Sequence, residues 1–460
     1  MTPSVVVIGA GIAGLAAAYE LLRCGVTPIV LEASDRAGGL ILTEREGPFL
    51  IDAGPDSILA TKPGGTALCE ALGLGDRLIS TTPPRTSSVL KGGRLHPLPR
   101  PAVLGLPLTW RAAAGATMIS PAGRARMTLE PWIPAGVTPD ESIASFIGRR
   151  FGRQAVEYLA EPLLAGIHAG DIDRLAVQPL FPALVDAERA HGSVMKGLRE
   201  RSTEAVSQPA SEPREGLFLS LPGGMGEIVQ TLEAALPRGT IQLRARVSAV
   251  RQEDGQFRVY RHEGRVSCAA VIVAAPAWAA QELLEALDPM LATLCGGIPY
   301  TSSAIVTLAF DLDAVGEPLT GSGFVVPRAE RQPIMAATWV SSKWSGRAPS
   351  DSVLMRAFLG GARDPDAVNR SDADLVDAAL RTLTPIARLS GAPRLARVYR
   401  WRRASPQLEV GHLARLAAIE QRLQAWPGLF LTGSGYRVTG IPDGIEDARA
   451  IARKAVKFVG

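Results

Sequence analysis

The chain is short of cysteine, histidine and aromatic residues, and each shortage excludes a class of structure. Its 4 cysteines are far apart and form no CxxC pair, so neither a disulfide framework nor a cysteine-ligated metal is indicated. Its 5 histidines show no spacing typical of metal ligands, and we therefore expect no metal site. Aromatic residues make up 5% of the chain against 47% hydrophobic residues, which predicts a large and mostly aliphatic core.

Long apolar runs and an excess of one charge are also missing. No uncharged apolar segment reaches the ~18 residues of a membrane-spanning helix. The hydrophobic start lacks the basic region and the cleavage site of a signal peptide. The 49 basic and 45 acidic residues leave a net charge of +4 with mixed signs, which gives no support for a nucleic-acid partner. These absences predict a cytoplasmic protein that is, at most, peripheral on the inner face of the cell membrane.

What the chain does have is a glycine-rich turn near its N-terminus. A β-branched strand, Val5–Ile8, runs into this turn, and an Ala-rich helix follows it. Gly9 permits a tight turn, Gly11 lets the backbone approach a pyrophosphate, and Gly14 lets the helix lie close on the strand. Glu32, 21 residues after Gly11, is placed to accept hydrogen bonds from ribose hydroxyls. We expect dinucleotide contacts from Gly9, Ala10, Gly11, Ile12, Ala13, Gly14 and Glu32.

The residues after Glu32 favour a flavin over a nicotinamide. Arg36 stands beside the glycine pair Gly38–Gly39, just past the acid. This arrangement resembles the second fingerprint of flavoproteins in the amine oxidase superfamily, in which the Arg approaches the ribose and phosphate of the cofactor. The Gly- and Pro-rich segment Asp52–Ser57 indicates a loop. The resemblance implies FAD as cofactor, with contacts from Ala33, Arg36, Gly39, Leu40, Gly54, Pro55, Asp56 and Ser57.

A second glycine-rich turn lies close to the C-terminus. Gly428–Gly433 predicts a strand leading into a Gly turn, and Gly440–Gly444 precedes a segment with helical periodicity, Ile445–Phe458. In FAD oxidases of this kind the last helix directs its positive end at the flavin, where negative charge collects on reduction. Pro442 and Asp443 also fit an ordinary helix start. The resemblance places Val247, Trp401, Val438, Gly440, Ile441 and Pro442 at the cofactor.

The order of these patterns predicts an α/β protein with a Rossmann-like FAD-binding domain built from discontinuous segments. The wholly apolar segment Ala270–Pro276 predicts a strand buried on both faces, as in a parallel sheet. We expect residues 83–215 to form a mostly helical, membrane-contacting domain and residues 277–395 a sheet-based substrate-binding domain. The substrate should bind where these insertions meet the flavin. The FAD-binding domain is expected to consist of residues 1–82, 216–276 and 396–460.

Two further motifs are specific enough to point to one family. The run Gly166–Asp171 has no evident packing role, and it looks like the Gly-hydrophobic-x-Ala-Gly-Asp signature of the FAD-dependent protoporphyrinogen and coproporphyrinogen oxidases. Gly440–Asp443 resembles the closing flavin motif of the same family. Weaker matches extend the resemblance over essentially the whole chain, at Leu217–Gly226, Thr338–Trp339, Lys343–Trp344, Arg400–Trp401, Pro406–Gln407 and Gly411–His412.

This resemblance implies an oxygen-dependent oxidoreductase of haem biosynthesis. A porphyrinogen would lose six electrons and six protons, by hydride transfer from meso carbons to flavin N5, and O2 would reoxidise the flavin. Protoporphyrinogen IX is the first choice of substrate, and coproporphyrinogen III is the alternative. Pyrrole N–H protons can leave through tautomerisation, so positioning would carry the catalysis. We therefore expect no indispensable catalytic side chain.

The resemblance also places residues around the substrate. Gly166 would lie against the macrocycle, where a side chain would clash, and Val325 and Phe358 would pack on its rings. Val325 and Phe358 fit an ordinary core position equally well. Plant and animal relatives carry a propionate-binding Arg where this chain has Val103. The candidates to replace that Arg are Arg94 and Arg100.

Three alternatives remain open in the sequence. An amine oxidase or a carotenoid desaturase would use the same scaffold, and a flavin-binding protein without turnover is the third. Amine oxidases usually frame the amine with aromatic residues, but only Tyr436 lies near the C-terminal flavin turn. The apolar stretch Leu104–Trp110 predicts either peripheral membrane contact or an internal helix or loop. We also expect handover of the porphyrin to a downstream metal chelatase.

Overall fold

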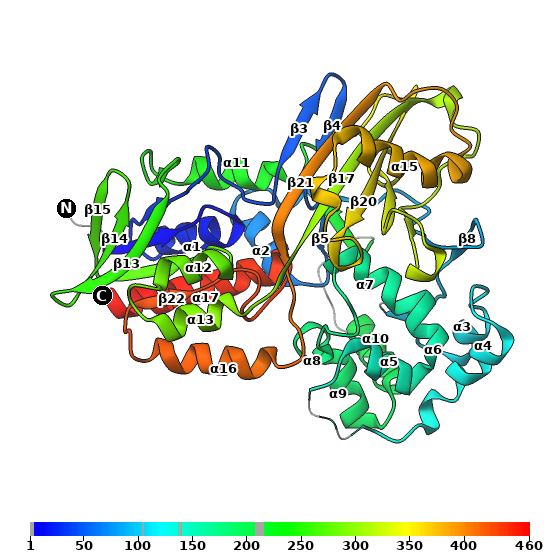
Figure 1. Ribbon diagram of the computed structural model, residues 1–460, viewed down its shortest axis with the longest axis horizontal. Helices are drawn as coiled ribbons and strands as arrows, with labels where there is room; N and C mark the ends of the chain where they lie inside the picture. The colour runs from blue at the N-terminus through cyan, green and yellow to red at the C-terminus, as the bar shows by residue number, and fades with distance from the viewer. Residues whose placement is uncertain (1–3, 104, 137, 139, 208–215) are drawn as a thin grey trace.

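The strand β1 (Val5–Ile8) lies at the centre of a five-stranded sheet. The computed structural model describes residues 4–103, 105–136, 138, 140–207 and 216–460. All five strands are parallel, in the order β12-β2-β1-β16-β22, and they come from distant parts of the chain (Figure 1). The other four strands are β2 (Ile29–Leu31), β12 (Ile241–Gln242), β16 (Ala270–Val273) and β22 (Leu429–Leu431).

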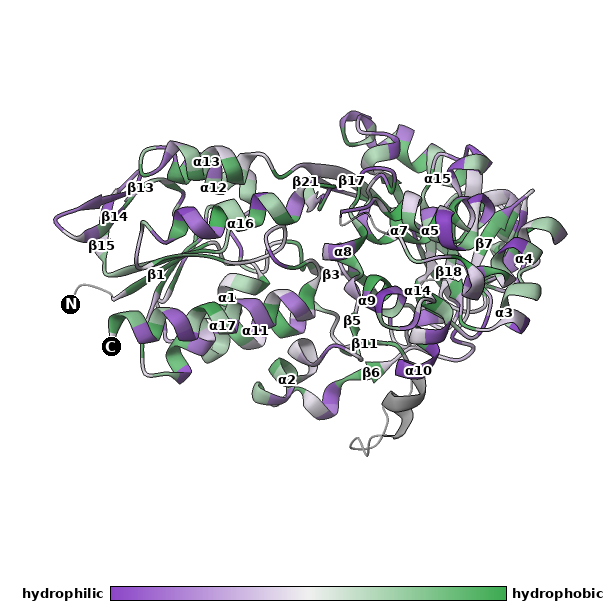
Figure 2. Ribbon diagram, turned by 90° about the horizontal axis from the view of Figure 1, so that it is seen from below, coloured by the Kyte–Doolittle hydropathy of each residue, from purple (hydrophilic) through white to green (hydrophobic). Residues whose placement is uncertain are grey.

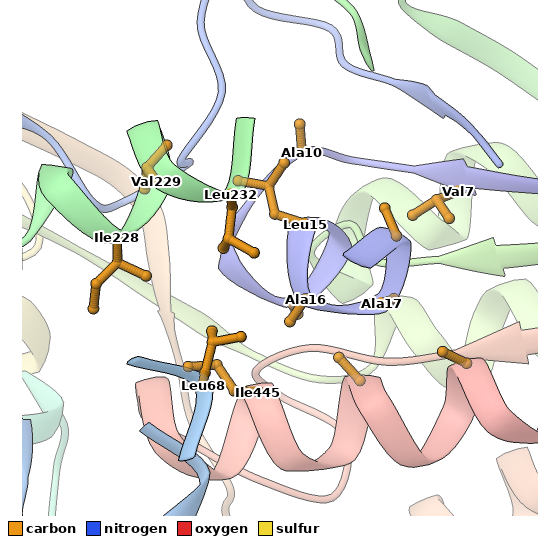
Figure 3. Packing of buried hydrophobic residues seen from close by; sticks show 14 of the residues in the cluster. Val7, Ala10, Leu15, Ala16, Ala17, Leu68, Ile228, Val229, Leu232 and Ile445 are labelled. Carbon is orange, nitrogen blue, oxygen red and sulfur yellow. The ribbon is translucent and has the colours of Figure 1, made fainter. Parts of the chain in front are cut away.

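Alternation along β1 divides the core between the two faces of this sheet. Val5 and Val7 belong to a buried cluster with the helix α1 (Ile12–Arg23), whereas Val6 and Ile8 belong to a cluster on the other face. Figure 3 shows the first cluster, in which side chains of α1 lie between those of α11 and α17. The helices on this face are α1, α2 (Pro63–Ala71), α11 (Gly226–Ala235) and α17 (Ile441–Val459).

The second face of the parallel sheet is covered by two helices and a small meander. All four residues of β16 are buried, as the apolar sequence predicts for a strand covered on both sides. This arrangement of a parallel sheet between helices confirms the predicted α/β class. The covering elements are α12 (Ala277–Leu284), α13 (Pro289–Gly296), β13 (Val247–Glu253), β14 (Gln256–Arg261) and β15 (Gly264–Cys268).

Residues 241–247 alternate between apolar and polar side chains, which predicts one continuous strand, but the strand is interrupted. β12 ends at Gln242, Arg244 adopts a left-handed φ of 55°, and β13 begins at Val247. The Arg244 N–H donates to the Ser34 carbonyl and the Ala245 N–H donates to the Glu32 carbonyl, both at 2.8 Å. The bend therefore keeps this segment beside the acid loop and starts β13 close to it. The side-chain alternation could not show it, because the bend is a backbone property.

A second, mixed sheet of seven strands lies beside the parallel sheet and its helices (Figure 1). Its order is β21-β17-β20-β19-β18-β7-β8, and α15 (Asp372–Ala387) packs on one of its faces. The sheet combines strands from all three predicted units, so the domain limits remain a prediction. Its strands are β7 (Ser87–Lys91), β8 (Arg94–Pro97), β17 (Tyr300–Asp311), β18 (Gly323–Val325), β19 (Ala336–Trp339), β20 (Ser352–Gly360) and β21 (Leu395–Pro406).

The chain between β8 and residue 207 folds mainly into helices, which lie below the seven-stranded sheet in Figure 1. It begins with a short hairpin, β9 (Ala102–Val103) and β10 (Leu106–Pro107). A π-helix (Val156–Ala160) leads directly into α7 (Glu161–His168). The other helices are α3 (Trp110–Ala114), α4 (Pro121–Thr128), α5 (Ile143–Phe151), α6 (Arg153–Ala155), α8 (Val177–Leu180), α9 (Pro182–His191) and α10 (Val194–Ser207).

The apolar stretch considered for membrane contact is largely turned inward. Leu106 and Leu108 are 1% and 7% exposed, Trp110 is 62% exposed, and Leu104 lies outside the described residues. Figure 2 shows polar and apolar residues interspersed along the outer helices α3 and α4. Among the helices that the structure describes, none is both long enough and apolar enough to cross a bilayer.

Short elements connect the part built on the parallel sheet to the part built on the seven-stranded sheet. β3 and β4 form a hairpin, β5, β11 and β6 form a small antiparallel sheet, and α14 joins β19 to β20. Their bounds, with that of α16, are β3 (Thr43–Glu46), β4 (Phe49–Asp52), β5 (Ile58–Leu59), β6 (Ile79–Ser80), β11 (Phe218–Ser220), α14 (Val340–Lys343) and α16 (His412–Leu423).

Candidate flavin and substrate site

Two glycine-rich turns meet at the N-terminus of α1. The Gly38 N–H donates to the Ala10 carbonyl at 2.8 Å, and Gly38 also forms an isolated parallel bridge with Gly11. Gly9 and Gly14 have no room for side chains. A Cβ on Gly9 would lie 2.9 Å from a carbonyl oxygen just after β16, and a Cβ on Gly14 would lie 1.9 Å from the carbonyl oxygen of Gly9. These two glycines let α1 lie close on the sheet.

Gly11 lacks a side chain for a different reason. It is the N-cap residue of α1, and a Cβ there would meet no atom of the described residues within 4 Å. The free N–H groups and the positive end of α1 therefore face open space. A pyrophosphate fits this place, since it would accept hydrogen bonds from these N–H groups. The turn is thus a suitable cradle for the phosphates of FAD.

Glu32 ties the acid loop to the first glycine turn. Its Oε2 accepts a hydrogen bond from the Ala10 N–H at 2.7 Å. Its Oε1 accepts from both the N–H and the hydroxyl of Ser34 at 2.8 Å, and Ala33 is exposed beside it. A carboxylate offers about four lone-pair sites, so Glu32 retains capacity for a ribose hydroxyl.

Arg36 shapes the loop that carries the second glycine pair. Its guanidinium donates to the carbonyls of Ala37 and Ile41 at 3.1 Å and to the carbonyl of Gly39 at 2.5 Å. Gly39 has a φ of +58°, and the neighbouring Leu40 is 44% exposed. These bonds use only part of the five N–H donors of an Arg, so a cofactor phosphate could still be reached.

The loop Gly54–Ser57 is held tightly against this first loop. A Cβ on Gly54 would lie 1.9 Å from the Leu40 carbonyl oxygen. The Trp401 indole N–H donates to the Ala53 carbonyl at 2.9 Å, and Arg356 donates to the Gly54 carbonyl at 2.6 Å. Leu40, Gly54 and Trp401, which were predicted separately, therefore lie together.

Asp56 sits in a cage of cationic and N–H donor groups. Its carboxylate accepts from the Lys343 ammonium at 3.0 and 2.8 Å and from the Trp344 indole N–H at 3.1 Å, and Arg356 lies 3.9 Å away. Burial opposes ionisation of Asp56, but Lys343 and Arg356 outweigh it and hold the pKa of this carboxyl well below its usual range. The carboxylate of Asp56 is thus bonded to protein partners, and flavin contacts from Pro55 and Ser57 remain a prediction.

The C-terminal glycine turn lies against the start of α1. A Cβ on Gly433 would lie 3.7 Å from the Cβ of Ala13. The Gly435 N–H donates to the Val438 carbonyl at 3.1 Å, which closes the turn, and His412 Nε2 bonds to the Tyr436 carbonyl at 2.7 Å. The two ends of the chain therefore border the same space.

The helix α17 starts next to this turn. Gly440 is its N-cap, and Pro442 lies in its first turn. Asp443 forms an ion pair with Lys62, and α2 packs so closely that a Cβ on Gly64 would lie 2.2 Å from the Pro442 carbonyl oxygen. These contacts fix the positive end of α17 against α2, and its direction towards a flavin remains a prediction.

A row of residues crosses the seven-stranded sheet on the face opposite to α15. Val325 pairs with Ala336 across β18 and β19, and Ala336 pairs with Phe358 across β19 and β20. Gly166 of α7 lies over this row. A Cβ on Gly166 would lie 3.6 Å from both the Cβ of Ala336 and a methyl carbon of Val325. Gly166, Val325 and Phe358, three of the five residues predicted to contact the substrate, are therefore brought together.

The same face carries the link to the flavin loop. Arg356 precedes Phe358 by two residues in β20, so both side chains point to the same face, and the Arg356 guanidinium carbon lies 5.1 Å from the centre of the Phe358 ring. Arg356 is the residue that donates to the Gly54 carbonyl. Phe358, at one end of the row, therefore lies next to the residue that binds the loop expected to hold the flavin.

The basic and imidazole groups lie around this row rather than in it. Burial, together with the charge of Lys62, lowers the pKa of His168 to about 4, and its ring packs edge-on against Phe181 at 5.9 Å. Arg94 is exposed in the edge strand β8, two strands away from Val325. Arg100 is exposed and donates to the Arg85 carbonyl. The structure does not bring either Arg to Gly166.

None of the four cysteines forms a disulfide, and Cys24 is exposed whereas Cys69, Cys268 and Cys295 are buried. Within the described ranges, no group of three or more His, Cys, Asp and Glu side chains is arranged to hold a metal ion. The chemistry of the site therefore rests on its glycine turns, its buried Arg and Lys residues and its apolar row.

Comparison with known proteins assigns this arrangement to a family. Residues 12–456 match the family model of flavin containing amine oxidoreductases. The chain belongs to this family. As a member, it is a flavin-dependent oxidoreductase, and the predicted FAD cofactor is confirmed.

Three relatives narrow the assignment within the flavin-containing oxidoreductases. Coproporphyrinogen III oxidase of Bacillus subtilis (strain 168) is 33% identical, and the alignment covers 99% of this chain and 98% of that protein. Protoporphyrinogen oxidase 2 of Arabidopsis thaliana is 26% identical over 94% of this chain and 89% of its own length. A crystal structure from Exiguobacterium sp. 255-15, provisionally named protoporphyrinogen oxidase, is 31% identical with a TM-score of 0.86, covering 99% of both chains. The predicted resemblance to the porphyrinogen oxidases is confirmed.

Several residues of the site were missed by the sequence analysis. Ala336 gave no signal, because a small apolar residue in a strand is typical of any core. Arg356 and Lys343 meet Asp56 across roughly 300 positions of sequence, which no local pattern reveals. Lys343–Trp344 had been noted as a motif, and its role as the partner of Asp56 appears only in three dimensions.

Proposed function

We propose that this protein is an FAD-dependent porphyrinogen oxidase that converts coproporphyrinogen III to coproporphyrin III. Protoporphyrinogen IX is the second candidate substrate. The observation that carries the proposal is the apolar row Val325–Ala336–Phe358 under Gly166. Arg356, two residues before Phe358, connects this row to the Gly54 loop. A flat apolar macrocycle needs such an apolar surface beside the flavin, bordered by a position without a side chain.

The choice between the two substrates is supported by the relatives. The Bacillus subtilis coproporphyrinogen III oxidase shares 33% of its aligned residues with this chain, against 26% for the Arabidopsis thaliana protoporphyrinogen oxidase. This difference favours what the sequence analysis held as the alternative. Coproporphyrinogen III carries four propionates, so the proposal needs cationic anchors at the rim of the site. Arg94 and Arg100 remain the candidates.

The chain's own contribution to the reaction is positioning. Bound FAD supplies the two-electron acceptor for each C–H bond that is oxidised, and O2 is the proposed final oxidant. Gly166, Val325 and Phe358 hold the ring so that a meso C–H faces the flavin, which turns a bimolecular encounter into an oriented one. No side chain in this row has an acid or base group, consistent with loss of the pyrrole N–H protons through tautomerisation.

The amine oxidase alternative finds little support in the position of Tyr436. This side chain is 1% exposed and belongs to the buried cluster beneath the parallel sheet. It cannot frame an amine over the flavin, which is the role an aromatic residue there would need. A carotenoid desaturase would require no anchors for carboxylates.

We also propose a cytoplasmic location. Contact with the inner face of the cell membrane would be peripheral and would use exposed side chains such as Trp110 and Trp132, which are 62% and 76% exposed. The porphyrin product is chemically ready for metal insertion. Handover to a downstream metal chelatase therefore belongs to the proposal.

A side-by-side turnover assay tests the proposed function. The purified FAD-loaded protein is incubated in air with coproporphyrinogen III, protoporphyrinogen IX or a polyamine, and the red fluorescence of a porphyrin product is followed. We expect the highest kcat/KM with coproporphyrinogen III and no peroxide from the polyamine. Formation of no porphyrin from either tetrapyrrole would overturn the proposal, and a clear preference for protoporphyrinogen IX would reverse the choice of substrate.

A further inference from the structure

The carboxylate of Glu161 joins three segments of the chain. Glu161 is the first residue of α7. Its Oε1 accepts from the Arg363 guanidinium at 3.0 and 2.6 Å, and its Oε2 accepts from the Arg328 backbone N–H at 3.0 Å. Arg363 ends the short helix that follows β20, and Arg328 begins the one that follows β18. One side chain thus connects α7 to the ends of two sheet strands.

These two strands carry the proposed floor of the substrate site. β18 ends at Val325, and β20 contains Phe358 close to its end. Gly166 lies five residues after Glu161 in the same helix and faces the row. Glu161 therefore links the wall of the site to both sides of its floor, without touching the row itself.

The other end of α7 is held in a similar way. The Ala362 N–H donates to the Ala169 carbonyl at 2.8 Å, and Gly361 is so close that a Cβ would lie 2.5 Å from the same oxygen. The His168 carbonyl accepts from the Ser405 hydroxyl at 2.7 Å. Those contacts fix the C-terminal end of the helix through the backbone. At the N-terminal end, the side chain of Glu161 bonds α7 to the segments that follow β18 and β20.

The surroundings of Glu161 favour a geometric role over a large contribution to stability. The side chains of Glu161 and Arg363 are 15% and 11% exposed. Glu161 and Arg328 also line an open groove of about 830 Å³, so solvent reaches one side of the ion pair. Partly solvated pairs contribute little to the free energy of unfolding, because hydration of the separate ions offsets much of the attraction. A bidentate guanidinium contact still fixes direction and distance.

We propose that Glu161 is a positioning residue for the tetrapyrrole: by bonding to Arg363 and Arg328 it holds α7, and with it Gly166, in place against the Val325–Phe358 row. This inference rests on the proposed function, since it assumes that the macrocycle binds along this row beside Gly166. The contacts of Glu161 with Arg363 and Arg328 act on binding of the ring and not on its oxidation. Their loss therefore weakens binding and removes no reacting group. A displacement of about 1 Å at such a site is enough to impair a reaction strongly.

The test compares variants of the FAD-loaded enzyme in two measurements. Binding of the oxidised product, coproporphyrin III, is followed by quenching of its fluorescence, and steady-state oxidation of coproporphyrinogen III gives kcat and KM. We expect Glu161→Ala and Arg363→Ala each to raise Kd and KM about tenfold, with kcat within about threefold of wild type. The double variant should be no worse than either single variant, because both remove the same interaction. Glu161→Gln should lie between, since its amide oxygen still accepts from Arg328.

A matched control separates positioning from general weakening. Glu141 pairs with Arg149 at 2.9 Å, and its carboxylate bonds only Ser145 and Arg149 in the described structure. Glu141→Ala should lower Tm as much as Glu161→Ala and leave Kd unchanged. A wild-type Kd in Glu161→Ala, or additive losses in the double variant, overturns the inference. Failure of wild-type enzyme to oxidise either porphyrinogen would refute the proposed function instead.

Arg363→Lys covers the case in which Glu161→Ala does not fold. It keeps the charge but loses the two-N–H contact, so we expect a threefold to fivefold increase in Kd with full FAD content (about 0.6–1 kcal/mol). Normal coproporphyrin III binding by Arg363→Lys, together with unfolding of Glu161→Ala, would show that the pair serves stability alone and would overturn the inference.

Discussion

Gly39 lies directly against Gly11: a Cβ added to Gly39 would lie 3.1 Å from the Cα of Gly11. The two residues belong to different cofactor motifs, and each lacks a side chain for its own reason. Gly39 has a φ of +58° and backbone behind it, whereas the side-chain position of Gly11 opens to free space. Substitutions at the glycines of this turn should therefore have separable effects.

Gly11→Ala should impair FAD binding without destabilising the protein. The backbone φ of −66° suits alanine, and the new methyl group meets no described atom within 4 Å. The free energy of unfolding without cofactor should change by less than about 0.5 kcal/mol, while FAD affinity should fall at least about tenfold because the methyl group occupies the path of the pyrophosphate. FAD titration and denaturant unfolding measure the two quantities.

Gly14→Ala provides the contrast. Its Cβ would lie 1.9 Å from the Gly9 carbonyl oxygen, so the backbone of the turn must move. Overpacking of this kind should lower the free energy of unfolding by about 1–3 kcal/mol, even without FAD. Identical unfolding curves for Gly14→Ala and wild type would contradict the packing, and unchanged FAD affinity in Gly11→Ala would contradict the cradle.

Glu32→Ala should weaken FAD retention by about 1.5–3 kcal/mol, the range for hydrogen bonds to charged groups. The carboxylate has capacity for a ribose hydroxyl and also holds the Ala10 N–H at 2.7 Å. Ser34→Ala is the matched control, since it removes the hydroxyl that bonds to Glu32 and to the Arg36 carbonyl but leaves the carboxylate of Glu32 in place. Dissociation of FAD during dialysis gives the measurement. If Glu32→Ala retains FAD as well as Ser34→Ala does, the ribose assignment is wrong.

The substrate wall should respond to the size of the residue at position 166. A Cβ there makes ordinary contacts of 3.6 Å, so Gly166→Ala should fold normally and lose only part of its kcat/KM. Gly166→Leu has no room above Ala336 and Val325, so it should displace α7 from the row and abolish porphyrinogen oxidation while FAD stays bound. Turnover and the flavin absorbance spectrum are measured on the same samples. Unchanged kcat/KM in the leucine variant would show that the macrocycle does not bind beside Gly166.

His168 should give the protein a pH-dependent stability between about pH 4 and pH 6.5. Burial and Lys62 lower its pKa from 6.5 to about 4 in the folded state. Between these values the unfolded chain binds more protons, so the free energy of unfolding falls as the pH falls. His168→Gln should remove this slope, and His262→Gln, at an exposed site in the β14–β15 hairpin, should keep it. Denaturant unfolding at several pH values decides, and equal slopes in all three proteins would contradict the prediction.

The sequence was most informative where one residue type is required locally. Gly9 and Gly14 are forced by backbone oxygens within 3 Å, and the buried strand β16 follows from an uninterrupted apolar run. Such requirements are visible in a short window. The α/β class and the cofactor followed from them.

The remainder of the site depends on contacts between residues that are far apart in the sequence, which no short stretch of sequence can reveal. Arg356 reaches Gly54 from another sheet, and Ala336 matters only because its strand lies between those of Val325 and Phe358. The bend at Arg244 was missed because the residue type Arg does not indicate a left-handed backbone conformation. These features belong to the register of strands and to the packing of distant segments.

The meeting of both chain ends around one cofactor space affects the order of events during synthesis. Gly433, which borders the first glycine turn, is translated more than 400 residues after that turn, and α17 follows it. Since domains generally begin to fold while synthesis continues, the nascent polypeptide must wait for Gly433 and α17 before it can enclose the flavin. Messages truncated shortly before that helix should consequently yield colourless, protease-sensitive products rather than partly active enzyme.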